Sequence, residues 1–159
     1  MILKSNEVFL FGSNLTGFHG AGGAGLACRG VSENTWRDDL WFLKAMKSKP
    51  GSPECVGKWA IFGVAKGFQE GREGKSYAIA TVVRPGARRS IPIGEIYAQL
   101  VEFWKFVKEH PALVFVISPI GEGYAGYSRK EMDEIWQQLF EHHGTRLNVR
   151  FVRPPDNIT

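Results

Sequence analysis

The sequence predicts an α/β domain with a largely parallel sheet. Short continuous apolar runs, which are typical of buried strands, alternate along the chain with segments whose apolar residues recur at helical spacing. Glycine-rich loops follow two of these runs directly, and most of the 19 glycines lie in three short segments. A length of 159 residues with 43% apolar residues suits one core, so we expect a single domain over residues 1–159.

The first half of the chain is predicted to hold a strand, a glycine loop, a helix and an irregular insert. The apolar run Val8–Phe11 predicts a buried strand, and residues 21–29 permit a helix. The insert spans about residues 29–58. Within it, apolar residues at helical spacing predict one short amphipathic helix, opened by Ser32 or Asn34.

The second half continues the alternation of strands and helices. β-Branched and aromatic residues predict strands, and three- and four-residue spacing predicts helices. Ser128 and Glu131 form a capping box that opens the last helix. The predicted elements are a glycine loop at 63–74, a strand at 77–83, a helix at 93–109, a strand at 113–118, a helix from 128 to 143 and a strand at 147–151.

The first glycine loop, Gly12–Gly25, is a candidate binding site. Ligands of parallel sheets lie at the carboxyl ends of the strands, where glycines and a helix start present backbone N–H groups to an anion. Asn14 offers a donor and an acceptor to a ribose, and His19 can bind a phosphate or transfer a proton. The alternative is that these glycines serve tight helix–sheet packing.

Two further segments carry polar groups of interest. In the loop from Ile117 to Tyr127, Glu122 is a candidate general base or ribose acceptor, and Tyr124 or Tyr127 can stack on a ribose or base. The alternatives are a solvated carboxylate and aromatic wall packing. The 63–74 loop holds Lys66 and Arg72, which would meet phosphate charge unless the segment is a mobile surface loop.

Charge and cysteine content narrow the classes of partner. A net charge of +4 favours anionic partners. The two cysteines form no CxxC pair and give no metal array, so no metal site is expected. We expect no cofactor. The N-terminus lacks the pattern of a signal peptide and no apolar stretch would span a membrane, so we expect a cytoplasmic protein without a membrane partner.

The motifs FGSNLTGFHGAGGA, GREGKSYAIAT and ISPIGEGYAGY, in this order, resemble a divergent macro-domain group that is common among phage and bacterial proteins. The resemblance spans about residues 7–30 and 60–151 and leaves the insert uncovered. It implies a three-layer α/β/α fold and binding of ADP-ribose, with Asn14 at the distal ribose. The ligand-binding residues assigned from the motifs and this resemblance are Gly12, Ser13, Asn14, Gly20, Gly22, Gly23, Gly25, Gly121, Gly123, Tyr124, Gly126 and Tyr127.

We therefore expect binding of ADP-ribose or a related NAD-derived nucleotide, free or attached to a macromolecule. Hydrolysis of an ADP-ribosyl linkage stays open, with His19 and Glu122 as acid/base candidates and Asn14 as the residue that orients ribose or water. Ala24 and Ala125 stand near the places where hydrolases of the family carry aspartates. One alternative is a non-catalytic reader or sponge of a signal nucleotide.

Nucleic-acid binding is the other alternative, although nucleic acid is not the expected partner. It would use two groups of arginines, and the chain carries no known nucleic-acid-reading motif. The two groups are Arg84, Arg88 and Arg89, and Arg146, Arg150 and Arg153.

Overall fold

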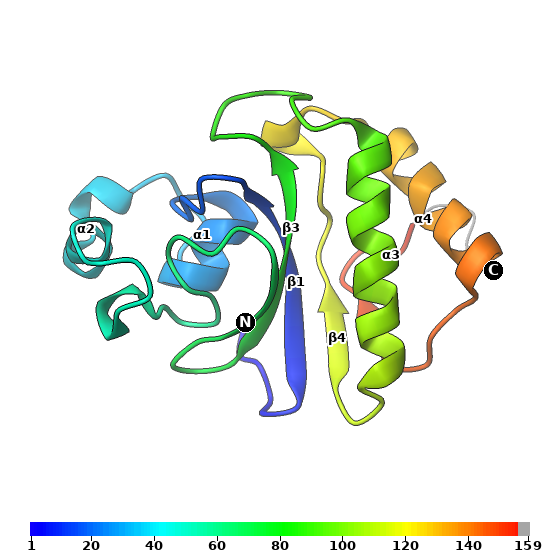
Figure 1. Cartoon of the computed structure of the whole chain (residues 1–159), viewed down its shortest axis with the longest axis horizontal. Coiled ribbons are helices and arrows are strands. Elements are labelled where there is room, and N and C mark those ends of the chain that lie inside the picture. The colour runs from blue at the N-terminus through cyan, green and yellow to red at the C-terminus, as the bar shows by residue number, and fades with distance from the viewer. Residues whose placement is uncertain (156–159) are drawn as a thin grey trace.

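The computed structural model describes residues 1–155, which form a five-stranded sheet with helices on both faces (Figure 1). The strand order is β2-β3-β1-β4-β5, and β2–β3 is the one antiparallel pair among the four pairs of strands described. The predicted α/β class and the mostly parallel mixed sheet are thus confirmed. The strands are β1 (Glu7–Asn14), β2 (Gly67–Glu70), β3 (Lys75–Val82), β4 (Val114–Ile117) and β5 (Val149–Phe151).

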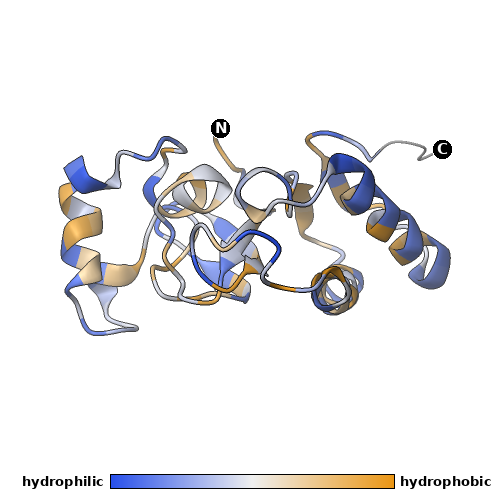
Figure 2. Ribbon diagram, turned by 90° about the horizontal axis from the view of Figure 1, so that it is seen from above, coloured by the Kyte–Doolittle hydropathy of each residue, from blue (hydrophilic) through white to orange (hydrophobic). Residues whose placement is uncertain are grey.

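Four α-helices and three short 3-10 helices complete the described chain. Helix α1 and the insert cover one face of the sheet, and α3 and α4 cover the other, which makes three layers (Figure 1). Seen from above, the insert and the α3–α4 pair lie at opposite ends of the molecule (Figure 2). The helices are α1 (Gly22–Arg29), η1 (Trp36–Asp38), α2 (Leu40–Met46), η2 (Pro53–Cys55), α3 (Ile93–Glu109), η3 (Gly123–Ala125) and α4 (Arg129–His143).

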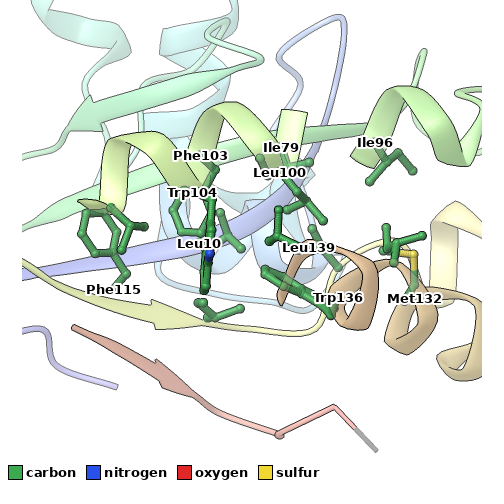
Figure 3. Close-up of a cluster of buried hydrophobic side chains, with 14 of the residues drawn as sticks. Leu10, Ile79, Ile96, Leu100, Phe103, Trp104, Phe115, Met132, Trp136 and Leu139 are labelled. Carbon is green, nitrogen blue, oxygen red and sulfur yellow. The ribbon is translucent and has the colours of Figure 1, made fainter. Parts of the chain in front are cut away.

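Strand β1 is the central strand, and both of its faces are buried. Val8 and Leu10 join the core under α3 and α4, whereas Phe9 and Phe11 pack with α1 on the opposite face. Alternate residues of a strand point to opposite faces, so burial of both faces requires the continuous apolar run seen in the sequence. The larger core, in which α3 and α4 meet the strands, is drawn in Figure 3.

The sheet topology creates a crevice between β1 and β4. Strand β1 runs parallel to both β3 and β4, so the carboxyl ends of all three strands lie at one edge of the sheet. The chain leaves β1 toward β3 on one side and leaves β4 toward β5 on the other. Loops that diverge in this way leave space between them, which is where open α/β sheets bind ligands.

The 63–74 segment is not only a loop, because it contains the edge strand β2. Residues 67–70 pair with the first half of β3. Beyond β2, the Gln99 side chain of α3 pairs with β3 as a strand would. Its Oε1 accepts from the N–H of Ala80 and its Nε2 donates to the carbonyl oxygen of Ala80, both at 2.8 Å. Gln69 is buried, and its side chain bonds the loop backbone at Ile61 and Val64.

The insert also differs from its prediction in the position of its helix. Helix α2 begins after Asp39, whose carboxylate accepts from the N–H of Phe42, and not after Ser32 or Asn34. Phe42 is fully buried while Leu40 is 83% exposed, so the apolar spacing did not identify the buried face. Across residues 1–155 we find no helix with the length and apolar character needed to cross a membrane.

Candidate functional site

A cavity of about 470 Å³ lies at the carboxyl ends of β3, β1 and β4. Its volume is within the range of small-molecule sites. The lining residues come from five segments of the chain, within 12–14, 18–24, 34–37, 81–86 and 119–125. The two predicted glycine loops therefore meet at one site, and the insert and the turn after β3 add walls that the motifs did not include.

The first wall is the start of α1, which no side chain caps. Ala21 occupies the N-cap position in extended conformation and provides no capping oxygen. The N–H of Gly22 donates to the carbonyl of Ser32 at 2.7 Å, but those of Gly23 and Ala24 have no acceptor in residues 1–155. Unpaired donors at a helix N-terminus favour an anion, because the helix dipole is positive there.

The facing wall is the loop between β4 and α4. Within the described chain, the N–H groups of residues 121–124 have no acceptor, whereas those of residues 125–127 bond inside the loop. Gly121 and Gly123 have φ of +77° and +60°. At Gly121 a Cβ would lie 2.4 Å from Sδ of Met132, so only glycine fits this turn against α4. The loop thus offers a second run of backbone donors.

The side chain of Asn14 is engaged with its own loop. Its Oδ1 accepts from the N–H groups of Thr16 and Phe18 at 3.1 and 3.2 Å and from the Thr16 hydroxyl, and its Nδ2 donates to the carbonyl of Phe18 at 2.8 Å. Asn14 is 6% exposed, yet it lines the cavity. Its amide therefore holds the shape of the loop that passes the cavity floor.

His19 lies in the core and not on the cavity wall. Its side chain is fully buried, with the ring edge-on to Phe11, and Nε2 donates to the carbonyl of Val64 at 2.8 Å. Nδ1 has no partner in the described residues. Burial lowers the pKa of His19 to about 4, so the ring is neutral at pH 7. His19, an acid/base candidate, therefore does not face the cavity.

Glu122 lines the cavity and forms an ion pair with Arg153. The pair ties the β4–α4 loop to the segment after β5. The guanidinium of Arg153 donates to Oε2 of Glu122, so part of the acceptor capacity of this carboxylate is used within the chain.

The two tyrosines of this loop occupy different environments. Tyr124 is 71% exposed at the cavity mouth, and a Cβ at Gly22 would lie 3.6 Å from its ring. Tyr127 is buried: its hydroxyl donates to the carbonyl of Ile91 at 2.5 Å, and the guanidinium of Arg89 lies over its ring. Tyr124 is thus available to a ligand, and Tyr127 serves packing.

The assigned site residues divide into two groups. Most of them line the cavity, and the others do not. The lining group is Gly12, Ser13, Asn14, Gly20, Gly22, Gly23, Gly121, Glu122 and Tyr124. The group that does not line it is His19, Gly25, Gly123, Gly126 and Tyr127; of these, Gly123 is exposed. Gly25 shows the reason: a Cβ there would lie 2.7 Å from the carbonyl oxygen of Val31, so its glycine serves close packing.

The motifs missed two parts of the cavity. Pro85 and Gly86, in the turn after β3, line it because β3 ends beside β1 at the same edge of the sheet. Recognising β3 as the neighbour of β1 would have identified them. Asn34, Trp36 and Arg37 of the insert also line it. The aromatic residues of the insert had suggested a cap over the pocket or an interface, with packing as the alternative, but no pattern pointed to Asn34 or Arg37 as cavity residues.

Most of the arginines considered for nucleic-acid binding are engaged within the chain. Arg89 pairs with Glu131 at 2.7 Å and Arg150 with Glu7 at 2.9 Å, in addition to the Arg153–Glu122 pair. Arg146 donates to backbone carbonyls and lies over Trp104. Residues 1–155 contain no group of three or more His, Cys, Asp or Glu placed to hold a metal ion.

Comparison of the chain with protein-family models, curated proteins and solved structures finds no match. The cavity and its walls are therefore the basis for a functional proposal.

Proposed function

We propose that the chain binds ADP-ribose or a related NAD-derived nucleotide in this cavity, with the diphosphate on backbone N–H groups. The observation that carries the proposal is the uncapped start of α1 opposite a second run of free N–H donors at residues 121–124. The one carboxylate among the described lining residues, Glu122, is paired with Arg153, so both runs of donors suit a diphosphate better than a neutral or cationic ligand. The resemblance of the glycine loops to macro domains supports the same ligand class.

Two aromatic side chains support a nucleotide over inorganic phosphate alone. Tyr124 lies at the mouth beside Gly22, and Trp36 forms part of the insert wall. Tyr124 is 71% exposed, and Trp36 is half-buried in the cavity wall. An aromatic ring provides apolar area for a ribose or base at little entropic cost.

The chemistry of the site favours binding over cleavage. Of the three acid/base and orienting candidates, His19 does not face the cavity, Glu122 is held by Arg153, and the Asn14 amide is occupied by its own loop. General acid–base catalysis needs a group that reaches the reacting atom and changes its protonation there. We therefore propose a reader or sponge that holds its nucleotide intact.

Isothermal titration calorimetry tests this proposal directly. We expect ADP-ribose to bind, pyrophosphate to compete with it, and adenosine to bind weakly because it lacks the group that the N–H donors hold. Tyr124→Ala should weaken ADP-ribose binding several-fold, whereas the control Tyr97→Ala, on α3 and outside the cavity, should not. Absence of ADP-ribose binding would refute the proposal.

Turnover is tested separately with ADP-ribosylated protein, ADP-ribosylated DNA and NAD-derived cyclic nucleotides, followed by mass spectrometry. We expect the bound nucleotide to be recovered unchanged. Cleavage that disappears in Glu122→Gln would instead establish a hydrolase and contradict the non-catalytic part of the proposal.

A further inference from the structure

Two charged residues, Arg37 and Glu122, are among the described residues that line the cavity. Glu122 is neutralised by Arg153. Arg37 has no carboxylate within ion-pair distance among residues 1–155. The cavity wall therefore carries one uncompensated positive side chain, and it comes from the insert.

The guanidinium of Arg37 stacks on an aromatic ring. Its Cζ lies 4.3 Å from the centroid of Trp36, and Trp36 packs edge-on against Phe18 at 5.1 Å. Stacking uses the face of the guanidinium and leaves its N–H edge open, which is the edge that forms paired hydrogen bonds with a phosphate. Trp36 thus restricts Arg37 without using the groups that would bind an anion.

The insert wall is fixed beside the start of α1 by a buried arginine. The side chain of Arg29 is 3% exposed and donates to Gly20, Glu33, Thr35 and Asp39 at 2.7 to 3.0 Å. These bonds join the segment that carries Arg37 to the loop that leads into α1.

A second contact brings Trp36 close to the same loop. A Cβ on Gly20 would lie 3.0 Å from Cδ1 of Trp36. Arg37 therefore stands on a wall that adjoins the free N–H groups of Gly23 and Ala24, and the contacts of Arg29 and Trp36 hold that wall in place.

We propose that Arg37 is a specificity-determining residue of the cavity, which binds the ligand phosphate from the insert side while the backbone donors bind it from the sheet edge. This inference rests on the proposed function and adds to it. The backbone donors attract any anion weakly, whereas a stacked guanidinium adds a full charge and a planar pair of donors. The site then prefers phosphate esters, above all diphosphates, over carboxylates of similar size.

The test compares Arg37→Ala with Arg72→Ala in calorimetric titrations of pyrophosphate and ADP-ribose. Arg72 is a matched control, because it is exposed and lies over Trp41 at 5.4 Å but outside the cavity. We expect Arg37→Ala to weaken both ligands about tenfold or more, the effect of losing charge-assisted hydrogen bonds. Arg72→Ala should leave both affinities unchanged, and Arg37→Lys should recover only part of the loss.

A second readout separates a binding role from a structural one. The affinity of the parent protein for pyrophosphate should fall with added salt, and Arg37→Ala should flatten that dependence because one positive charge is gone. Acetate should compete poorly with pyrophosphate for the cavity of the parent protein.

The outcomes distinguish this inference from the proposed function. Equal affinities for the parent protein and Arg37→Ala would overturn the role of Arg37 and leave ADP-ribose binding intact. If pyrophosphate binds but ADP-ribose does not, the proposed function fails. The role of Arg37 is then decided by comparing the pyrophosphate affinities of the parent protein and Arg37→Ala. If neither ligand binds the parent protein, both are overturned.

Discussion

Helices α1 and α4 follow glycine loops from neighbouring parallel strands, but they begin in opposite ways. At α4 the Ser128 hydroxyl accepts from the N–H of Glu131 at 3.0 Å, and the Glu131 carboxylate accepts from the N–H of Ser128 at 2.9 Å. At α1 the equivalent position is Ala21, and the donors face a cavity instead of a cap. In α4 the helix's own capping residues bond N–H groups at the helix start, whereas in α1 the free N–H groups stay available to a ligand.

Ionisable groups beside the two starts differ as well. The loop before α1 packs around the neutral, buried His19, whose pKa is about 4 because of burial. At α4 the carboxylate of Glu131 has a pKa of about 2, chiefly because of its hydrogen bonds with Arg89 and then with the Ser128 backbone. The stability of the α1 side thus depends on a neutral His19, and that of the α4 side on an ionised Glu131.

Mild acid should destabilise the α1 side first, and this is the largest effect we predict. A histidine with a lowered folded pKa contributes stability that is full above the unfolded value of 6.5 and is lost as pH falls toward 4. We expect a loss of about 2 kcal/mol in the free energy of unfolding by pH 5. The Glu131 contribution persists to lower pH, because it is present above about 4.5 and is lost toward 2.

Urea unfolding at several pH values measures this loss. The control is His19→Phe, which keeps the buried ring, while the carbonyl of Val64 still accepts from Nε2 of Gln69. If the variant shows the same decline between pH 6.5 and 5 as the parent protein, His19 is not the cause.

A capping side chain at the start of α1 should raise the stability of the protein and lower its affinity for the ligand. Ala21→Asp places a carboxylate at an N-cap whose backbone is already extended. We expect stability to rise by about 1 kcal/mol and ADP-ribose affinity to fall at least tenfold, because the carboxylate competes with the phosphates. Ala21→Ser should give a similar stability gain with a smaller loss of affinity.

Thermal unfolding and calorimetric titration measure the two effects on the same samples. Unchanged affinity in the stabilised Ala21→Asp protein would show that no phosphate binds at the start of α1.

Removing the cap of α4 should have the smallest effect and should not reach the cavity. Ser128→Ala is expected to cost about 1 kcal/mol of stability, as is usual for a lost N-cap. ADP-ribose affinity should stay within a factor of two, because Ser128 does not line the cavity. A large loss of affinity, measured by the same titration, would mean that the two helix starts are coupled.

The elements predicted correctly were those with strong local signals. Helix α3 begins at Ile93 and ends at Glu109 as expected, since its apolar spacing is regular and a proline precedes it. The capping box of α4 formed as the sequence indicated. Strand β2 was missed because its glycine-rich segment has no strand pattern of its own. Its pairing with β3 is what makes it a strand.

The site shows the same division between local and tertiary causes. The glycine loops after β1 and β4 were recognised because their glycines and flanking strands are adjacent in sequence. His19 looked catalytic within a glycine loop, but the fold turned it into the core, where it bonds Val64, 45 residues away. Arg37 shows the opposite case. It lies in no recognised motif, and it reaches the cavity wall because the contacts of Arg29 hold the insert beside α1.

The sequence by itself determined the layered α/β architecture, the two loops at the carboxyl edge and the capped start of α4. Each depends on residues close together in the chain, whose periodicity or capping chemistry acts locally. Only the tertiary structure decided which polar side chains reach the cavity, because that depends on contacts between distant segments. The buried Arg29 joins the insert to α1, and the packing of 17–19 against 63–64 buries His19.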